Sequence, residues 1–196
     1  MIFDIVASSI GLIILSPILF IVSLIAIFFQ GLPILFFHDR LGKNGNSFKM
    51  VKFRTMISGP SISAEHDITR LTKWGRFLRK TSIDELPVLI NVIKGDMSLV
   101  GPRPLPVKYL TRFNSFQKQR MNIKPGITGL AQIHGRNRLS WEDRFKYDFD
   151  YIEKRTFLLD LIIIFKTLFL VAYRKNVDGE NQEIMPEFMG SDKNEI

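Results

Sequence analysis

The feature that most constrains this fold is an uncharged stretch near the N-terminus. From Ile5 to Phe29 the chain carries no charged side chain, and serines are the polar residues among apolar side chains and glycine. A helix of roughly 20 apolar residues is long enough to cross the hydrocarbon core of a bilayer. The stretch lacks the basic start and the cleavage site of a secretory signal peptide. We therefore expect a membrane-embedded helix.

The pair Ser16-Pro17, near the middle of this stretch, leaves two topologies open. Proline removes a backbone hydrogen bond and kinks or breaks a helix. A straight helix would cross the membrane and place the basic residues that follow, from Arg40 to Arg54, in the cytoplasm. A helix broken at Ser16-Pro17 would enter one leaflet and return, so that both of its ends lie on the cytoplasmic side. The residues alone do not choose between these topologies.

The rest of the chain is basic and contains no cysteine. The absence of Cys from the 196 residues excludes disulfides, thiolate zinc sites and a cysteine nucleophile. The net charge is +8, but residues 176–196 hold one Lys and six Asp or Glu, so residues 1–175 carry +13. A body this basic favours anionic partners, such as phospholipid head groups, nucleotide phosphates or nucleic acid.

Sequence patterns after residue 30 predict an α+β fold that is mostly helical. Apolar runs on both sides of GKNGNS (42–47) predict a small β-hairpin. An amphipathic basic helix is expected over 68–80, either at a membrane interface or with its apolar face in the core. The remaining elements are helices over 105–122, 140–155 and 157–173, the last interfacial or partly buried, and an extended or irregular segment over 127–135.

The expected organisation has three parts. The membrane helix occupies residues 1–29, and a single domain follows over residues 30–175, a length that suffices to bury a core. Residues 176–196 are expected to form a mobile acidic tail.

Two adjacent carboxylates, Asp84 and Glu85, stand out within TSIDELPVLINVIKGDMSLVGPRP (81–104). The pattern Ser82-x-x-Glu85 is a capping box, and acids in a first helical turn interact favourably with the helix dipole. Capping accounts for one carboxylate and leaves the second unexplained. Adjacent helical residues point about 100° apart, so the pair cannot flank a substrate. One carboxylate as nucleophile or metal ligand, assisted by its neighbour, is the functional interpretation.

Arg103, in the sequence GPRP, is a candidate phosphate ligand. Proline on both sides restricts the backbone, and the planar guanidinium matches two phosphate oxygens at once. The alternative is a rigid turn with a solvated arginine. The histidines His38, His66 and His134 show no metal-ligand spacing, and surface or core roles are expected for them. The chain also lacks the P-loop, GxGxxG, GxSxG and HExxH patterns.

Several blocks in a fixed order resemble the bacterial sugar transferase family, the polyprenyl-phosphate sugar-1-phosphate transferases or monotopic phosphoglycosyl transferases. The blocks are KFRTM (52–56), the 81–104 segment, KPGITGLAQIHGRN (124–137), and the spacing of Trp141, Arg144, Asp148 and Tyr151. The resemblance covers about residues 1–175 and fits the small members with one hydrophobic segment. It implies transfer of a sugar-1-phosphate from a UDP-sugar to a polyprenyl phosphate such as undecaprenyl phosphate, with release of UMP.

The resemblance also implies roles for individual residues. Asp84 would be the nucleophile that forms a covalent phosphosugar intermediate, and Asp84 and Glu85 would bind Mg²⁺. Arg103 would hold a phosphate, with Lys52, Arg54 and Arg136 as weaker candidates for phosphate or nucleotide contact. The family's Ser-Pro break maps onto Ser16-Pro17 and favours the re-entrant topology. The catalytic domain, residues 30–175, would then face the cytoplasm at the bacterial inner membrane, in contact with membrane lipid.

Two departures from the family pattern are visible. Only Met1 to Asp4 precede the membrane segment, where a basic pair is usual, and HDRLG (38–42) replaces the usual pattern around Arg40. The main alternative is a non-catalytic membrane-surface interaction protein, and a glycosyltransferase that moves only the sugar is another. The apolar N-terminus argues against nucleic acid as a partner. The sequence leaves open the sugar, the glycan pathway, the oligomeric state (a homodimer included), and the roles of Asp96, Asp148 and Tyr151.

Overall fold

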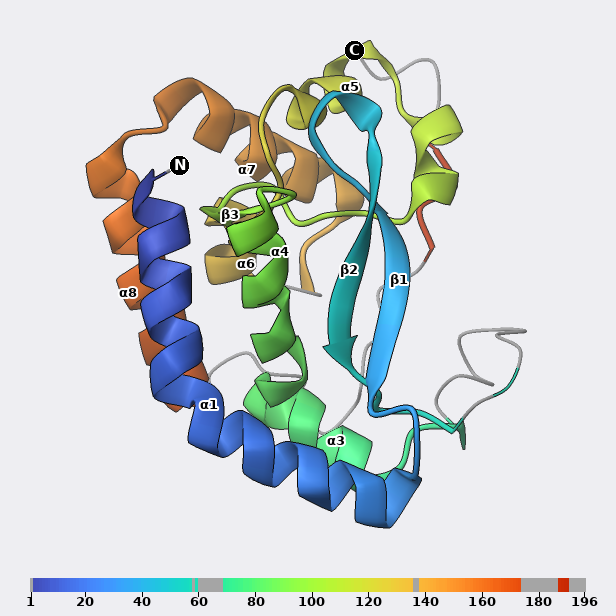
Figure 1. The fold of residues 1–196 in the computed structure, drawn as a ribbon. Helices are drawn as coiled ribbons and strands as arrows, with labels where there is room; N and C mark the ends of the chain where they lie inside the picture. The colour runs from blue at the N-terminus through green and yellow to red at the C-terminus, as the bar shows by residue number, and fades with distance from the viewer. Residues whose placement is uncertain (1, 58, 60–68, 136–137, 174–186, 191–196) are drawn as a thin grey trace.

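A bent N-terminal helix, a long β-hairpin and a series of short helices surround a pair of short parallel strands (Figure 1). The computed structural model describes residues 2–57, 59, 69–135, 138–173 and 187–190. In Figure 1 the N-terminal helix α1 runs down one side and beneath the molecule, the hairpin lies on the opposite side, and α4 lies between them. The expected α+β, mostly helical class is confirmed.

Helix α1 (Ile2–Gln30) is continuous, with Pro17 inside it, and it changes direction near its middle (Figure 1). Pro17 has no N–H to donate to the carbonyl of Ile13, four residues earlier. The Ser16 hydroxyl donates to that carbonyl instead, at 2.8 Å. The sequence predicted a break at Ser16-Pro17; the structure has a bend, because the serine satisfies the acceptor that proline leaves.

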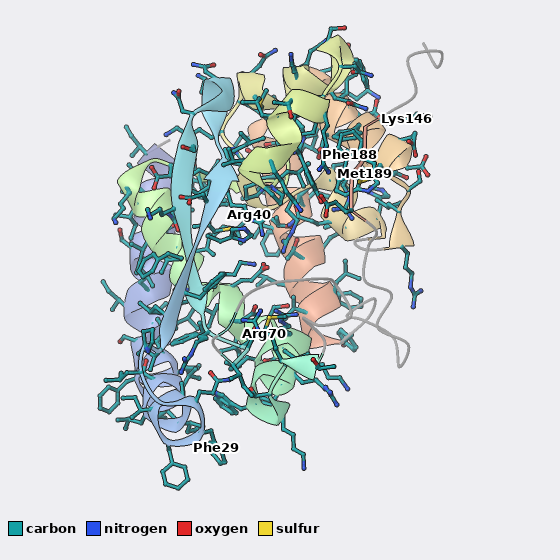
Figure 2. All side chains as sticks on the ribbon, turned by 90° about the vertical axis from the view of Figure 1, so that its right-hand side faces the viewer. Phe29, Arg40, Arg70, Lys146, Phe188 and Met189 are labelled. Carbon is teal, nitrogen blue, oxygen red and sulfur yellow. The ribbon has the colours of Figure 1, made fainter. Side chains whose placement is uncertain are left out.

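The surface of α1 is apolar over most of its length. It is the one helix in the described ranges that is long and apolar enough, by length and composition, to cross a membrane. Most of its large apolar side chains are exposed, whereas Val22 and Ala26 are buried against the body. Figure 2 shows the end of α1 at Phe29 standing at the edge of the molecule. An exposed apolar surface of this extent suits association with a membrane.

The predicted hairpin is confirmed. Strands β1 (Leu35–Leu41) and β2 (Ser47–Phe53) pair antiparallel, with Leu35 opposite Phe53 and Leu41 opposite Ser47. The short helical turn η1 (Lys43–Gly45) connects them. Along β2 the side chains of Val51 and Phe53 are buried. Because side chains alternate along a strand, Lys52 between them faces the other side.

The segment after the hairpin differs from the sequence prediction in its helix boundaries. Helix α3 (Lys73–Thr81) begins later than the predicted residue 68. Thr72 caps its start by accepting a hydrogen bond from Gly75 N. Its apolar face packs into the core at Leu78, which is fully buried. Next come the 3₁₀ helix η2 (Ile83–Val88), which carries Asp84 and Glu85, and α4 (Leu89–Lys94).

The predicted capping box at Ser82 and Glu85 is wrong. Ser82 adopts a left-handed conformation (φ 57°) at the end of α3, and its side chain makes no capping hydrogen bond. Its backbone N–H donates to the carbonyl of Arg79 and so helps to end that helix. Capping therefore does not account for the Glu85 side chain.

The predicted helix over 105–122 is also wrong. In its place lie three short turns, because the backbone is extended at Phe113 and Asn114. Asn114 starts a new helix through a capping box with Gln117. The three turns are η3 (Val107–Arg112), α5 (Ser115–Lys118) and η4 (Gln119–Asn122).

A pair of short parallel strands was not predicted. Strand β3 (Ser98–Val100) pairs with β4 (Gly126–Thr128), and α6 (Leu130–His134) follows where only extended or irregular structure was expected. A Cβ on Gly126 would lie 2.0 Å from Gly101 N, so glycine is required where these segments cross.

The last two predicted helices are confirmed as α7 (Trp141–Lys154) and α8 (Phe157–Ala172). Ser140 caps α7 and Thr156 caps α8 through their side-chain oxygens. Figure 1 shows α8 beside the first half of α1. The rings of Phe3 and Phe157 meet edge to face at 5.1 Å, which joins the starts of the two helices.

Four residues of the predicted acidic tail, 187–190, pack against the body. Phe188 is 2% exposed and lies in an aromatic cluster with Tyr109, Phe113, Trp141 and Phe145 (Figure 2). Glu187 forms ion pairs with Lys108 and Arg112. The expectation of a mobile tail is corrected for these four residues, since an aromatic side chain of this size fills a core site.

We predict that Phe188→Ala destabilises the protein. Removing a buried phenylalanine leaves a cavity and costs about 3 kcal/mol or more. Chemical denaturation of the detergent-solubilised protein, followed by tryptophan fluorescence, measures the loss. The exposed neighbour Met189 provides the control, because Met189→Ala should change the unfolding free energy by less than about 0.5 kcal/mol. Equal, small effects of both substitutions would contradict the packing of Phe188.

Candidate active site

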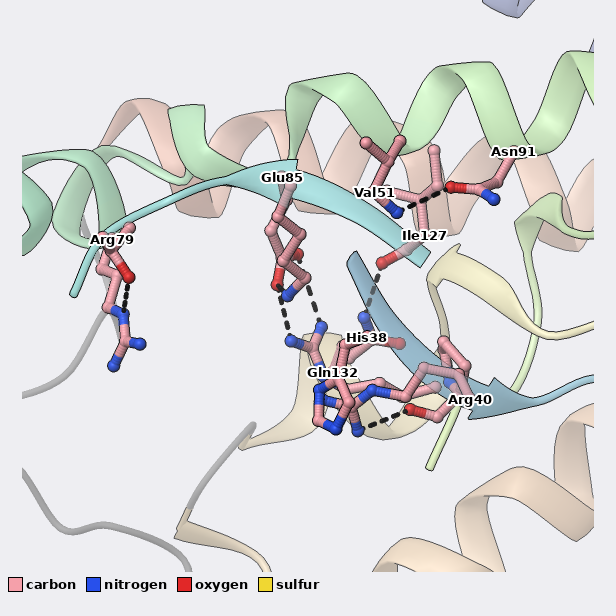
Figure 3. Close-up of polar contacts among 12 residues, drawn as sticks. His38, Arg40, Val51, Arg79, Glu85, Asn91, Ile127 and Gln132 are labelled. Carbon is pink, nitrogen blue, oxygen red and sulfur yellow. Dashed lines mark hydrogen bonds and ion pairs between the residues drawn. The ribbon is translucent and has the colours of Figure 1, made fainter. Parts of the chain in front are cut away.

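The centre of the site is the carboxylate of Glu85, which is held by two cations. Lys52 Nζ and Arg103 Nη2 each lie 2.6 Å from Glu85 Oε1, and Arg103 Nη1 lies 3.5 Å from Oε2 (Figure 3). These three side chains come from β2, η2 and the turn after β3. The sequence predicted Lys52, Glu85 and Arg103 as site residues, and the structure brings them together.

Asn91 places η2 and α4 against strand β2. Its side-chain carbonyl accepts a hydrogen bond from Val51 N at 3.1 Å (Figure 3), and its amide donates to Lys49 O at 2.8 Å. Asn91 is buried, so these bonds form where water cannot replace them. The amide thus extends the hydrogen bonding of β2 and sets Glu85 opposite Lys52.

The neighbouring carboxylate, Asp84, is placed differently. It is 8% exposed, and among the residues that the structure describes it makes no hydrogen bond or ion pair. Burial, and then the charge of Glu85, raise the pKa of Asp84 to about 6, although Lys52, Arg79 and Arg103 oppose this shift. Burial would also raise the pKa of Glu85, but Arg103 and Lys52 outweigh it and hold that pKa well below its usual range. One carboxylate is therefore fixed, while the other is available to a ligand.

Both carboxylates line a cavity of about 1070 Å³. One wall is cationic and includes Lys52, Arg79 and Arg103. Another part of the lining, the apolar wall, comes from the two apolar helices, with Leu15 of α1 and with Leu168 and Val171 of α8. The cavity can accommodate a molecule that has both an anionic and an apolar part.

Three arginines gather at the cationic wall. Burial, followed by the charge of Arg103, lowers the pKa of Arg40 to about 10 and that of Arg144 to about 10. Neighbouring positive charges repel one another, and an anion between them reduces that repulsion. The arrangement favours a ligand with several negative charges, such as a diphosphate.

His38 also lines the cavity. Arg40 Nη2 lies 3.0 Å from His38 Nδ1, and burial together with the charges of Arg40 and Lys52 lowers the pKa of His38 to about 4. His38 is thus neutral at physiological pH, with Nδ1 accepting from Arg40. The expectation of a surface or core role is corrected, since His38 lies on the wall of the site.

Of the two other predicted phosphate ligands, Arg54 and Arg136, the structure describes Arg54. The guanidinium of Arg54 donates to the carbonyls of Gln30 and Gly31, the latter at 2.7 Å, and so binds the C-terminal end of α1. Arg54 also borders the cavity. Arg136 lies outside the described residues. The bend at Ser16 and Pro17 lies in α1, next to Leu15, which lines the cavity.

Sequence reasoning missed Arg40, Arg79 and Arg144 as residues of the site. Arg40 and His38 lie two residues apart on β1, and Phe36 of the same strand is opposite Lys52. The alternation of side chains along the predicted hairpin therefore indicated that these residues share a face with Lys52. Arg79 Nε donates to Thr55 Oγ1 and its charge acts on Asp84, which no local pattern indicated (Figure 3).

The two carboxylates of the site suit a metal ion that is also bound by a substrate. Within the described ranges, no group of three or more His, Asp or Glu side chains could hold one. Mg²⁺ is commonly bound by one or two carboxylates together with substrate phosphates, and it keeps several waters. Asp84 and Glu85 fit that kind of binding, with Asp84 unpaired and Glu85 beside it.

Comparison with known proteins agrees with the chemistry of the site. A family model described as bacterial sugar transferase matches residues 1–174. A protein named uncharacterized sugar transferase EpsL from Bacillus subtilis is 45% identical over 163 residues, which cover 82% of this chain and 81% of the relative.

Two longer relatives have names that specify a reaction. The undecaprenyl-phosphate galactose phosphotransferase of Salmonella typhimurium is 40% identical over 191 residues, covering 88% of this chain and 40% of the relative. The UDP-glucose:undecaprenyl-phosphate glucose-1-phosphate transferase of Klebsiella pneumoniae is 42% identical over 178 residues, covering 85% of this chain and 38% of the relative.

Proposed function

The chain belongs to the bacterial sugar transferase family, and on this basis we propose that it transfers a sugar-1-phosphate from a UDP-sugar to a polyprenyl phosphate such as undecaprenyl phosphate, releasing UMP. The observation that supports this most directly is the contrast between the two carboxylates. Asp84 faces the cavity without a partner among the described residues, while Lys52 and Arg103 fix Glu85 beside it.

In the first proposed step, an Asp84 carboxylate oxygen attacks the phosphorus that carries the sugar. A new oxygen–phosphorus bond forms, the bond to the bridging oxygen of the diphosphate breaks, and UMP leaves with that oxygen. The product is a covalent aspartyl phosphosugar. An unpaired carboxylate suits this role, because no existing hydrogen bond has to be broken before attack.

In the second proposed step, an oxygen of the polyprenyl phosphate attacks the same phosphorus. The bond to Asp84 breaks, the carboxylate is regenerated, and the sugar becomes linked to the lipid through a diphosphate. The cationic wall, with Lys52 and Arg103, would stabilise the negative charge that both steps place on phosphate oxygens. The apolar wall from α1 and α8 would receive the start of the lipid chain.

We propose Mg²⁺ as the cofactor, held by Asp84 and Glu85 together with oxygens of the substrate. When bound, it would neutralise charge on the diphosphate. The low pKa of Glu85 keeps that carboxylate charged and therefore suited to a cation. Lys52 and Arg103 already bind Glu85, so Asp84 is the carboxylate of the two whose oxygens are not engaged by a cation in the described structure.

We further propose that α1 is re-entrant in the bacterial inner membrane, with the catalytic domain facing the cytoplasm. The bend at Ser16-Pro17 and the exposed apolar surface of both halves of α1 support this topology. In this arrangement the cavity would lie at the membrane surface, because Leu15 borders it from the middle of the helix. A polyprenyl phosphate would then reach Asp84 without leaving the bilayer.

Two other functions are distinguished by the product. A glycosyltransferase that moves only the sugar would release UDP, and a non-catalytic membrane-surface protein would release neither nucleotide. Incubating the membrane-reconstituted protein with undecaprenyl phosphate, Mg²⁺ and a panel of UDP-sugars identifies both the reaction and the sugar. The expected product is UMP from at least one donor of the panel.

We predict that Asp84→Asn lowers the rate of UMP release by at least about 10³-fold, since the amide is not a nucleophile. Intact-mass spectrometry after incubation with the UDP-sugar alone should detect a phosphosugar adduct on the unmodified protein and none on the variant. The matched control is Asp150→Asn, because Asp150 forms an ion pair with Lys154 on α7, away from the residues that line the cavity. Substantial turnover by Asp84→Asn would overturn the nucleophile assignment.

We predict that chelation stops turnover and that added Mg²⁺ restores it. Without the ion, the diphosphate would meet the two carboxylates with its charge uncompensated. UMP release is measured after EDTA treatment and after addition of MgCl₂, with NaCl of equal ionic strength as the control. Full activity of the thoroughly chelated protein would contradict a role for a divalent cation.

We predict that both ends of α1 lie on the same side of the membrane. Because the chain has no cysteine, Ile2→Cys and Lys43→Cys each introduce a unique thiol, one at the start of α1 and one in the hairpin turn. A membrane-impermeant maleimide should label both variants in inside-out vesicles and neither in right-side-out vesicles. Labelling of the two variants in opposite vesicle types would show that the helix crosses the bilayer.

A further inference from the structure

The turn that carries Arg103 is held by its backbone carbonyls. Four successive carbonyls, of residues 102–105, each accept a hydrogen bond, and the donors come from three parts of the chain. The pairs are Gly126 N to Pro102 O at 3.0 Å, Arg120 Nη2 to Arg103 O at 2.8 Å, Arg40 Nη1 to Pro104 O at 3.4 Å, and Leu41 N to Leu105 O at 2.9 Å. The two flanking prolines are buried, so the turn is fixed on every side except that of the Arg103 side chain.

The donor to the backbone carbonyl of Arg103, Arg120, belongs to a buried ion pair with Asp148. Arg120 Nε and Nη2 both donate to Asp148 Oδ2, at 3.1 Å and 2.7 Å. The two side chains are only 5% and 4% exposed. Arg120 therefore connects helix α7, through Asp148, to the carbonyl of the residue whose guanidinium binds Glu85.

A buried ion pair is an expensive way to join two elements. Removing both charges from water costs several kcal/mol per ion, and well-packed apolar residues often give equal or greater stability. Phe113 and Phe145 form an edge-to-face contact in the adjacent core, so apolar packing is already present there. What an apolar pair could not supply is a donor for the Arg103 carbonyl.

We propose that Arg120 and Asp148 are positioning residues for Arg103 in the sugar-phosphate transfer reaction, an inference that rests on the proposed function. Asp148 orients the guanidinium of Arg120, and Arg120 fixes the carbonyl of Arg103. Since prolines restrict the chain on both sides of Arg103, fixing this carbonyl also fixes its Cα. The Arg103 guanidinium is then presented at Glu85 without further ordering.

The first test is the substitution Arg120→Lys. Lysine keeps the positive charge beside Asp148 but lacks the planar fork that reaches both the carboxylate and the carbonyl. We expect kcat/KM for UMP release to fall on the order of 10- to 100-fold, as expected when a group that binds the reacting phosphate is slightly misplaced. The matched control is Arg112→Lys, because Arg112 likewise joins a carboxylate, Glu187, to a backbone carbonyl, Phe188 O, away from the cavity. The control should retain close to full kcat/KM.

A double-mutant cycle separates positioning from general damage to the fold. If Arg120 acts through Arg103, then Arg120→Lys should cause less than about a twofold further loss in a protein that already carries Arg103→Ala. A radiolabelled donor makes the residual rate measurable. Losses that multiply in full would overturn the inference while leaving the proposed function intact. Absence of UMP release from the unmodified protein would overturn both.

A second variant guards against loss of structure. Replacing the pair by Arg120→Met with Asp148→Leu removes both buried charges together, a change that cores often tolerate. We expect a cooperative thermal unfolding transition comparable to that of the unmodified protein and a kcat/KM as low as that of Arg120→Lys. A folded double variant with full activity would overturn the inference, because the pair would then be dispensable for placing Arg103.

Discussion

Two cations share a single carboxylate oxygen at the centre of this protein, and that contact links three segments that are distant in the sequence. Lys52 belongs to the hairpin, Glu85 to the 3₁₀ helix η2, and Arg103 to the turn after β3. Partly buried charges are tolerated only when they are paired, so each element needs the others in place. The same contact makes the pKa values of the two neighbouring carboxylates differ. Arg103 and Lys52 lower the pKa of Glu85, whereas burial and the charge of Glu85 raise that of Asp84. Neighbouring acids with opposed environments are a common basis for dividing chemical roles.

Helices α1 and α8 supply the apolar part of the cavity that contains this polar centre. Leu15 on α1 and Leu168 on α8 line the same cavity as Lys52 and Arg103. A soluble nucleotide sugar would need only the cationic wall. A cavity with both walls suits a reaction in which one substrate is a nucleotide and the other is a lipid phosphate. Leu15 lies just before the bend in α1, and beyond the bend the second half of the helix runs beneath α3 (Figure 1).

Local patterns predicted those elements that have enough length to show a period. The hairpin, α7 and α8 were found because each repeats its apolar positions over several residues. Strands β3 and β4 have three residues each, too few for an alternation to be visible. The helix predicted over 105–122 is interrupted at Asn114, whose capping box begins a new turn inside an otherwise helical pattern. Phe188 was assigned to a tail by the acidic residues around it, and only the aromatic cluster on the body shows that it is a core residue.

The site was predictable to the extent that its residues lie in short, chemically dense motifs. Asp84, Glu85 and Arg103 fall within one segment, and Lys52 lies in another block of the same family pattern. Arg40, Arg79 and Arg144 come from three separate elements, and they become neighbours only when the hairpin, α3 and α7 pack around the cavity. No spacing in the sequence encodes that meeting. One consequence of the packing is that burial, followed by the charge of Arg103, lowers the pKa of both Arg40 and Arg144.

Lys52 and Arg54 show why residue type alone did not settle the roles of the cations. Both lie in the segment KFRTM (52–56), two residues apart. Lys52 nevertheless binds Glu85, whereas Arg54 binds backbone carbonyls at the end of α1. Strand β2 ends between them, at Phe53, and Arg54 beyond it binds the end of α1 while it still borders the cavity. A cation at the C-terminal end of a helix is favoured by the unsatisfied carbonyls there. Arg54 therefore ties the C-terminal end of the apolar helix to the end of the strand that carries Lys52.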